Sequence, residues 1–308
     1  MWEAASLIDF SADPQWMTVW ERGDAQIFQA SPRGVEVNQD SDGTRLAMTS
    51  SLGVEYDPQF HLYLGRVPRA SLINPFPGSR RLRSSGTMPS ACVEADWVPV
   101  FASMAEGDRS LREVMTVLPE AEVELAVRAV ALVQYHTSHP YCSQCGHLTS
   151  MGDLGRTRLC GSCGTVHFPR TDPAVIVAIT DEDDCLLLGH HEGWERSRYS
   201  VFAGFVEAGE SLEQALCREV MEEVDVNVSD IRYQGSQPWP MPRSLMLGFT
   251  ATAFREDPCP DGEEITSARW FSREELRAAI ENGEVVLPVS ASIAYRLITA
   301  WYGEPLPS

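Results

Sequence analysis

Three glutamates stand close together in the chain, at Glu219, Glu222 and Glu223. On an α-helix, at about 100° per residue, they fall within an arc of roughly 100°. Carboxylates at this spacing repel one another by roughly a few tenths of a kcal/mol per pair, so stability alone would favour separating them. Mg²⁺ near a phosphate commonly binds carboxylates, phosphate oxygens and water. The cluster therefore favours a divalent-metal site, with a solvated acidic face as the alternative.

A helix is expected to carry these carboxylates. Ser211, followed three residues later by Gln214, forms a capping box that predicts a helix over residues 212–224. Apolar residues on the flank beside the glutamates can bury against a sheet; they are Leu216, Val220 and Val224.

The residues around this helix favour the metal site over the solvated face. A bend at Gly204 can bring a backbone carbonyl, for example that of Ala203, to the same ions. Arg218 stands next to the cluster. A solvated acidic face would explain neither the glycine loop nor the arginine.

Four of the eight cysteines form two tight pairs separated by 14 residues; they are Cys142, Cys145, Cys160 and Cys163. This is the spacing of a zinc ribbon, in which each pair presents two thiolates to one ion. A closed shell of four thiolates leaves no open position, which predicts one structural Zn²⁺ rather than a catalytic one. The other cysteines are expected to be small buried apolar residues; they are Cys92, Cys185, Cys217 and Cys259.

The chain is expected to form three parts, over residues 1–138, 139–170 and 171–308. The first is a small β-rich domain, with a β-type run at 60–64 and a turn-rich segment at 74–78, and it ends in a helix over 120–136. The second is the zinc ribbon. The third is an α/β layered domain, because strands alternate with helices. Its expected strands are 174–180, 185–188 and 244–254, and its further helices are 272–281 and 290–301.

Charge and hydropathy limit the partners. The net charge of −20 opposes broad electrostatic binding to nucleic acid or to an anionic membrane. An anionic small molecule can still bind where metal ions neutralise the site. No apolar run is long enough to span a bilayer and no signal peptide is evident, so we expect a cytoplasmic protein with no membrane partner.

The acidic segment resembles the Nudix box of hydrolases that split nucleoside diphosphates linked to another moiety. The pattern Gly-x₅-Glu-x₇-Arg-Glu-Val-x-Glu-Glu runs from Gly204 through Glu210 and Arg218 to Glu223. One position departs, because Asp225 stands where the family has the glycine of a helix C-cap.

A second segment is similar to the SQPWPFPxS signature of the NADH pyrophosphatase family. It is Ser236–Ser244, with Met241 in place of phenylalanine, and its prolines predict a rigid, non-helical loop that presents Trp239. Together with the zinc ribbon, the resemblance implies a Nudix α/β/α sandwich with a mixed sheet, preceded by the ribbon and the β-rich domain.

This resemblance implies roles for individual residues. The carbonyl of Ala203 and the carboxylates of Glu219, Glu223 and Glu264 would bind Mg²⁺ or Mn²⁺, and Glu222 or Glu223 would take the proton. Phe205 and Trp239 would clamp the nicotinamide ring. Further residues would line the substrate pocket: Gln237, Pro238, Pro240, Met241, Pro242, Arg243, Ser244, Met246 and Ala294. Phe168 would reach the site of a second subunit in a homodimer, and Arg112 matches a substrate-binding arginine.

The implied reaction is hydrolysis of NADH or NAD⁺ at the pyrophosphate to nicotinamide mononucleotide and AMP. Two alternatives stay open. Removal of NAD caps from RNA 5′ ends could be the main activity. A regulator that senses a dinucleotide without cutting it is the other, although such a protein would be expected to have lost catalytic glutamates.

Overall fold

The computed structural model describes residues 8–9, 15–41, 43–68, 97–107 and 109–307, which form two units, 4–170 and 171–308. The expected turn-rich segment 74–78 and Cys92 lie outside the described residues. Among those residues, no helix combines the length and the apolar character needed to cross a membrane.

The unit of residues 4–170 is built on a mixed sheet with strand order β6-β7-β1-β2-β8, to which β5 adds beside β1. β1 and β7 run parallel, and the other pairs are antiparallel. The strands are β1 (Gln26–Ala30), β2 (Gly34–Val35), β5 (Thr49–Ser50), β6 (His61–Pro68), β7 (Trp97–Met104) and β8 (Arg109–Ser110). Outside this sheet lie the hairpin β3 (Val37–Asp40) and β4 (Gly43–Leu46) and the short helices α1 (Trp16–Glu21) and α3 (Leu111–Val114).

Helix α4 (Glu120–Ser138) confirms the helix expected over 120–136, and it packs on β6 and β1. The cysteine segment that follows it forms a three-stranded sheet of β9 (Ser150–Gly152), β10 (Thr157–Leu159) and β11 (Val166–His167). Buried Arg158 joins the two parts. It donates to the Thr149 carbonyl at 2.7 Å, and its guanidinium lies 3.2 Å from Nδ1 of His136 on α4. The ribbon and α4 therefore share one buried hydrogen-bond network.

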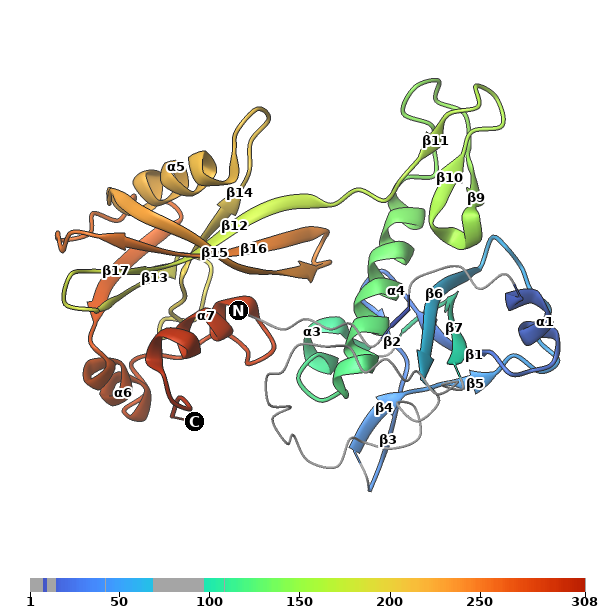
Figure 1. The fold of residues 1–308 in the computed structure, drawn as a ribbon, viewed down its shortest axis with the longest axis horizontal. Helices are drawn as coiled ribbons and strands as arrows, with labels where there is room; N and C mark the ends of the chain where they lie inside the picture. Colours follow the sequence, from blue (N-terminus) through green and yellow to red (C-terminus); the bar gives the residue numbers. More distant parts are fainter. Residues whose placement is uncertain (1–7, 10–14, 42, 69–96, 108, 308) are drawn as a thin grey trace, which may run out of the picture. The chain divides into compact units, whose positions relative to one another are not determined.

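In the unit of residues 171–308, a mixed sheet has strand order β15-β16-β12-β13-β17, with β14 beside β12 (Figure 1). β12 and β16 are parallel, and the other pairs are antiparallel. The strands are β12 (Asp172–Thr180), β13 (Leu186–His191), β14 (Phe202–Phe205), β15 (Val228–Trp239), β16 (Ser244–Ala253) and β17 (Ile265–Phe271). The helices are α5 (Leu212–Val224), α6 (Arg273–Glu281) and α7 (Ile293–Tyr302).

Both faces of this sheet are buried. Along β12, Val175, Val177 and Ile179 pack in the cluster that contains the apolar face of α5. Ile176 and Ala178 point the other way, into the cluster that contains α6 and α7. The predicted α/β/α sandwich with a mixed sheet is confirmed, because side chains alternate between faces along a strand and both sets are apolar.

Two local predictions are wrong. Residues 236–239 are not loop but the end of β15, paired with β16, and only residues 240–243 form the turn. β15 is an edge strand, which tolerates Pro238 because a missing N–H there breaks no ladder. α7 begins at Ile293 rather than 290, since the Ser292 side chain accepts from the Tyr295 N–H and caps the helix there.

The scattered cysteines also differ from expectation. Cys185 is buried, as predicted, whereas Cys217 and Cys259 are exposed. Cys217 lies on α5 next to buried Leu216 but on the solvent side of the helix, and Cys259 lies in the loop before β17.

The ends of α5 follow the sequence closely. Its first turn has the predicted capping box between Ser211 and Gln214. Its C-cap is Asp225, in the left-handed conformation at φ 55°, and the Asp225 N–H donates to the Met221 carbonyl. An aspartate thus holds a conformation that suits glycine, with its negative charge at the negative end of the helix dipole.

We expect Asp225→Gly to raise the free energy of unfolding by about 0.5–1 kcal/mol, because glycine adopts this conformation without a Cβ penalty. Asp225→Asn removes the charge alone and should give a smaller gain. Thermal or urea unfolding of the three proteins checks the order, and a glycine variant no more stable than wild type would contradict it.

Candidate active site and zinc centre

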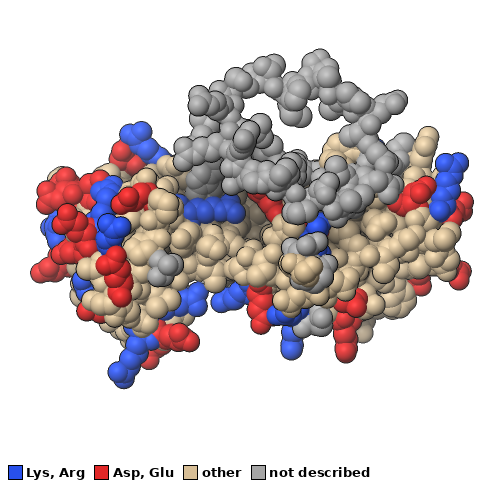
Figure 2. Space-filling model, turned by 90° about the horizontal axis from the view of Figure 1, so that it is seen from below, with Lys and Arg blue, Asp and Glu red and all other residues tan. Residues whose placement is uncertain are grey.

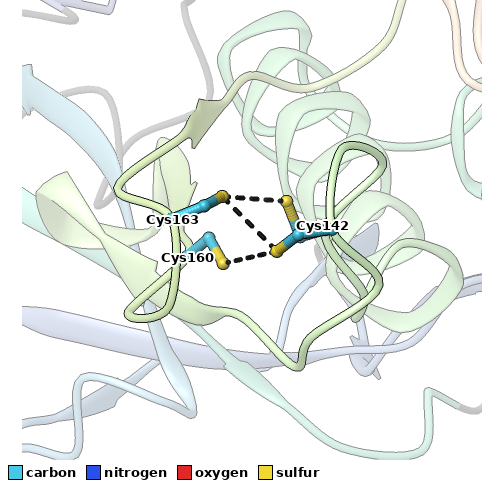
Figure 3. Close-up of side chains that lie close together, drawn as sticks. Cys142, Cys160 and Cys163 are labelled. Carbon is cyan, nitrogen blue, oxygen red and sulfur yellow. Dashed lines mark hydrogen bonds between the residues drawn. The ribbon is translucent and has the colours of Figure 1, made fainter.

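The four paired cysteines converge at one point (Figure 3). Their sulfurs lie 3.4–3.6 Å apart in three pairs, and all four lie within 4.8 Å of one another. These distances are too long for disulfides, and a tetrahedral zinc with bonds of about 2.3 Å needs sulfurs about 3.8 Å apart. Gly146 and Gly164, each after a pair, have φ 76°, which allows the tight turns. The donor set fits a closed, structural Zn²⁺.

In the other unit, the Glu219 carboxylate packs against the backbone of Gly204. A Cβ atom added at Gly204 would lie 1.8 Å from Cδ of Glu219, so only glycine fits beside this carboxylate. The bend expected at Gly204 is absent, because Gly204 lies inside β14 and pairs with Val175. Close approach, rather than a turn, is the reason for this glycine. Ala203, whose carbonyl is an expected metal ligand, directly precedes Gly204 in β14 and so lies beside the contact between Gly204 and Glu219.

Arg218 holds the segment before α5 in place. Its guanidinium donates to both oxygens of Glu210, at 2.7 and 2.9 Å, and to the Phe205 carbonyl at 3.0 Å. It also lies 3.1 Å from a carboxylate oxygen of Glu219 and 3.1 Å from one of Glu222. The hydrogen bonds from Arg218 lower the pKa of Glu210 to about 2. Glu222 is exposed and turned toward the arginine, which leaves Glu219 and Glu223 facing inward.

Glu223 is the unusual member of the cluster. It is only 6% exposed, and its Oε2 has no hydrogen-bond partner. Burial first, and then the negative charges of Glu219 and Glu264, raise the pKa of Glu223 to about 8. A buried, unpartnered carboxylate surrounded by like charges is costly unless a cation neutralises it. This orphaned oxygen and the all-carboxylate donor set fit Mg²⁺ or Mn²⁺.

Glu264 is exposed on the loop before β17. Its charge also contributes, after burial and the effects of Arg218 and Glu222, to the raised pKa of Glu219. Among the described residues, the four cysteines are the one group of three or more His, Cys, Asp or Glu side chains that lie close enough together to hold a metal ion, so the carboxylates are not gathered to that degree. Asp261, whose side chain accepts from the Glu264 N–H, was not predicted as a site residue. The turn-forming pair Asp261-Gly262 was the one signal in the sequence that pointed to it.

Several predicted substrate residues share one row across the sheet. Phe205 of β14 pairs with Ala174 of β12, Ala174 with Met246 of β16, and Met246 with Gln237 of β15. Residues in register on neighbouring strands point to the same face, here the face that α7 covers. Trp239 and Ser244 pair in the next row of that face. Phe205 is 54% exposed at the end of its strand and is available to a ligand.

Two of the predicted substrate residues, Gln237 and Arg243, already have hydrogen-bond partners within the unit of residues 171–308. The buried Gln237 amide donates to the Ala291 carbonyl at 2.7 Å and accepts from the Ile293 N–H at 2.6 Å. Gln237 thus ties β15 to the first turn of α7, which carries buried Ala294. Arg243 pairs with Asp172 at 2.6 Å. The remaining predicted pocket residues surround the turn after Trp239: Pro238 and Pro242 are exposed, Met241 is half-buried and Pro240 is buried.

Phe168 and Arg112 belong to the unit of residues 4–170 and are both exposed, Phe168 to 71%. The expected metal-binding carboxylates belong to the unit of residues 171–308, so the contacts of Phe168 and Arg112 with substrate stay predictions.

Comparisons identify both segments. Residues 170–288 match the NUDIX domain model, and residues 137–168 match the NADH pyrophosphatase zinc ribbon domain. A curated relative from Mycobacterium bovis, "NAD-capped RNA hydrolase NudC", is 39% identical over 201 residues, or 62% of this chain and 64% of the relative. One of the same name from Edwardsiella ictaluri is 41% identical over 175 residues, or 57% of this chain and 65% of the relative. The matches therefore span less than two thirds of these relatives' length.

Among solved structures, a NUDIX hydrolase from Nitrosomonas europaea aligns with a TM-score of 0.42 and 22% identity, covering 54% of this chain and 94% of that one.

The raised pKa of Glu223 predicts that protein without added divalent cations loses stability as pH rises from about 4.5 to about 8. The folded state binds the proton more tightly than the unfolded state, so this stabilisation is complete below the ordinary pKa and is lost through the raised one, on the order of a few kcal/mol. Thermal unfolding across this range should show the decline, and Mg²⁺ should offset it at pH 8.

Glu223→Gln should flatten this pH dependence. Glu222→Gln, which changes an exposed carboxylate whose charge is the smallest of the effects that raise the pKa of Glu223, should alter it much less. Equal pH profiles for wild type and Glu223→Gln would show that Glu223 is not the titrating group.

Proposed function

We propose that this chain is a hydrolase of NADH and NAD⁺, because residues 137–168 match the NADH pyrophosphatase zinc ribbon domain and residues 170–288 match the NUDIX domain. It cuts the pyrophosphate to give nicotinamide mononucleotide and AMP and depends on Mg²⁺ or Mn²⁺. The observation that carries the proposal is the buried, unpartnered Glu223 carboxylate among other carboxylates, at a sheet whose opposite face presents Phe205 and Trp239.

In this proposal the carboxylates of Glu219, Glu223 and Glu264 and the carbonyl of Ala203 hold the metal. Bound divalent cations supply charge neutralisation of the pyrophosphate and a lowered pKa for a bound water. Arg218 keeps the Phe205 carbonyl and Glu210 fixed, so that β14 and α5 hold one geometry. Catalysis is then mainly positioning and electrostatic stabilisation of in-line attack, with Glu222 or Glu223 taking the proton.

Phe205 and Trp239 would stack on the nicotinamide ring, which selects this dinucleotide among pyrophosphates. The Gln237 bridge to Ala291 and Ile293 supports this role, because it fixes the strand that carries Trp239 against α7. A homodimer in which Phe168 reaches the site of a second copy completes the proposal.

Removal of NAD caps from RNA is the second candidate, favoured by the name of the curated relatives. The same site would serve it, since the cap carries the same pyrophosphate. The RNA beyond the cap would add little electrostatic binding energy. Basic side chains on the face in Figure 2 are interspersed with acidic ones, and the net charge of the chain is −20.

Product analysis of the purified chain with NADH, NAD⁺, ADP-ribose and NAD-capped RNA, with and without Mg²⁺, tests the proposal. We expect nicotinamide mononucleotide and AMP from NADH only with metal, and a loss of kcat by orders of magnitude in Glu219→Gln with the fold intact. Retention of more than about a tenth of wild-type activity in Glu219→Gln would remove this residue from the site.

Trp239→Ala tests the ring clamp. If stacking contributes on the order of 1 kcal/mol or more, KM for NADH should rise about fivefold or more. ADP-ribose, which has no nicotinamide, should be affected less. Tyr233→Ala, which removes an exposed aromatic ring from the same strand, is the matched control. An equal loss of kcat/KM on both substrates would mean that Trp239 only shapes the turn.

A further inference from the structure

The side chain of Asp261 organises the backbone that carries Glu264. Its Oδ1 accepts hydrogen bonds from the N–H groups of Glu263 at 3.1 Å, Glu264 at 3.1 Å and Ile265 at 2.8 Å. Its Oδ2 lies 3.2 Å from the same Glu264 nitrogen. One carboxylate thus collects three successive N–H donors and holds the start of β17 in a single conformation.

The backbone of Asp261 is bound to α5. The Asp261 N–H donates to the Glu223 carbonyl at 3.1 Å, and the Cys259 N–H donates to the Val224 carbonyl at 2.9 Å. These are carbonyls of the last turn of α5, which have no partner within the helix. The loop therefore docks on the helix end at the residue whose carboxylate is buried and unpartnered.

The far side of Glu264 is fixed as well. Its carbonyl accepts from the Glu192 N–H at 3.0 Å, beyond the end of β13. Asp261 therefore joins Glu264 to α5: its N–H donates to the Glu223 carbonyl, and its side chain accepts from the Glu264 N–H.

We propose that Asp261 is a positioning residue that sets the separation between the Glu223 and Glu264 carboxylates, and through it the affinity for divalent cations. This rests on the proposed function, in which both carboxylates bind metal. Without the Asp261 side chain, the three N–H donors of Glu263, Glu264 and Ile265 lose their acceptor. Glu264 is then held only on its carbonyl side, while Glu223 stays on α5.

The test measures Mn²⁺ binding to the purified, zinc-loaded chain without nucleotide, by electron paramagnetic resonance. Asp261→Ala should weaken Mn²⁺ binding by about 10- to 100-fold, as loss of a residue that orients a metal ligand does. Asp261→Asn keeps an oxygen acceptor and should stay within a few-fold of wild type. Asp257→Ala, which removes an exposed carboxylate from the same loop, should bind Mn²⁺ like wild type.

A parallel assay on NADH should show kcat of Asp261→Ala recovering at high Mn²⁺, because the reacting groups are intact. Wild-type affinity in Asp261→Ala would overturn the proposal. So would equal weakening in Asp261→Asn and Asp261→Ala, since charge would then matter and not the hydrogen bonds; Asp261→Asn decides the question even if the alanine variant does not fold. A wild-type chain that binds no Mn²⁺ would instead refute the metal site of the proposed function.

Discussion

Negative charge gathered at one end of α5 is the constraint around which the unit of residues 171–308 is built. Arg218 offsets part of it, by pairing with Glu210 and Glu222 on the outer side. Glu223, on the inner side, has no such partner for Oε2. A buried charge without compensation costs several kcal/mol, so the apolar packing between α5 and the sheet must hold the helix in place without a cation.

Successive side chains of a strand point to opposite faces of the sheet, so neighbouring residues of β14 contact different surroundings. In β14, Gly204 faces α5 and meets Glu219, whereas Phe205 points to the face that α7 covers. In the proposed function, phosphate chemistry and ring recognition would therefore come from consecutive residues of one strand. A shift of β14 by one residue would turn the aromatic ring toward the carboxylates and place a side chain where only glycine fits, so the register with β12 is under strict constraint.

The sequence predicts well those features that depend on neighbours along the chain. The limits and capping box of α5, the burial of Leu216 and Val220, and the spacing of the cysteine pairs are local patterns, and the structure confirms them. Features that depend on a distant partner were missed. Pro238 argued for a loop because its edge position in the sheet was unknown, and the role of Gly204 could not be seen without Glu219 beside it.

The same limit applies to site residues. Asp261 lies in a turn-like sequence, and nothing local shows that its N–H meets α5. The roles expected for Phe168, Arg112 and the pocket residues come from resemblance, and they stay predictions alongside the three-part division of the chain.

Buried Arg158 has a consequence for how such proteins can diversify. Its hydrogen-bond partners are uncharged groups of Thr149 in the ribbon and His136 in α4. Exchange of the ribbon alone between related genes would separate the buried Arg158 guanidinium from its partner His136 in α4. The helix and the ribbon are therefore best inherited together, and a recombination point after Ser138, where α4 ends, would separate them.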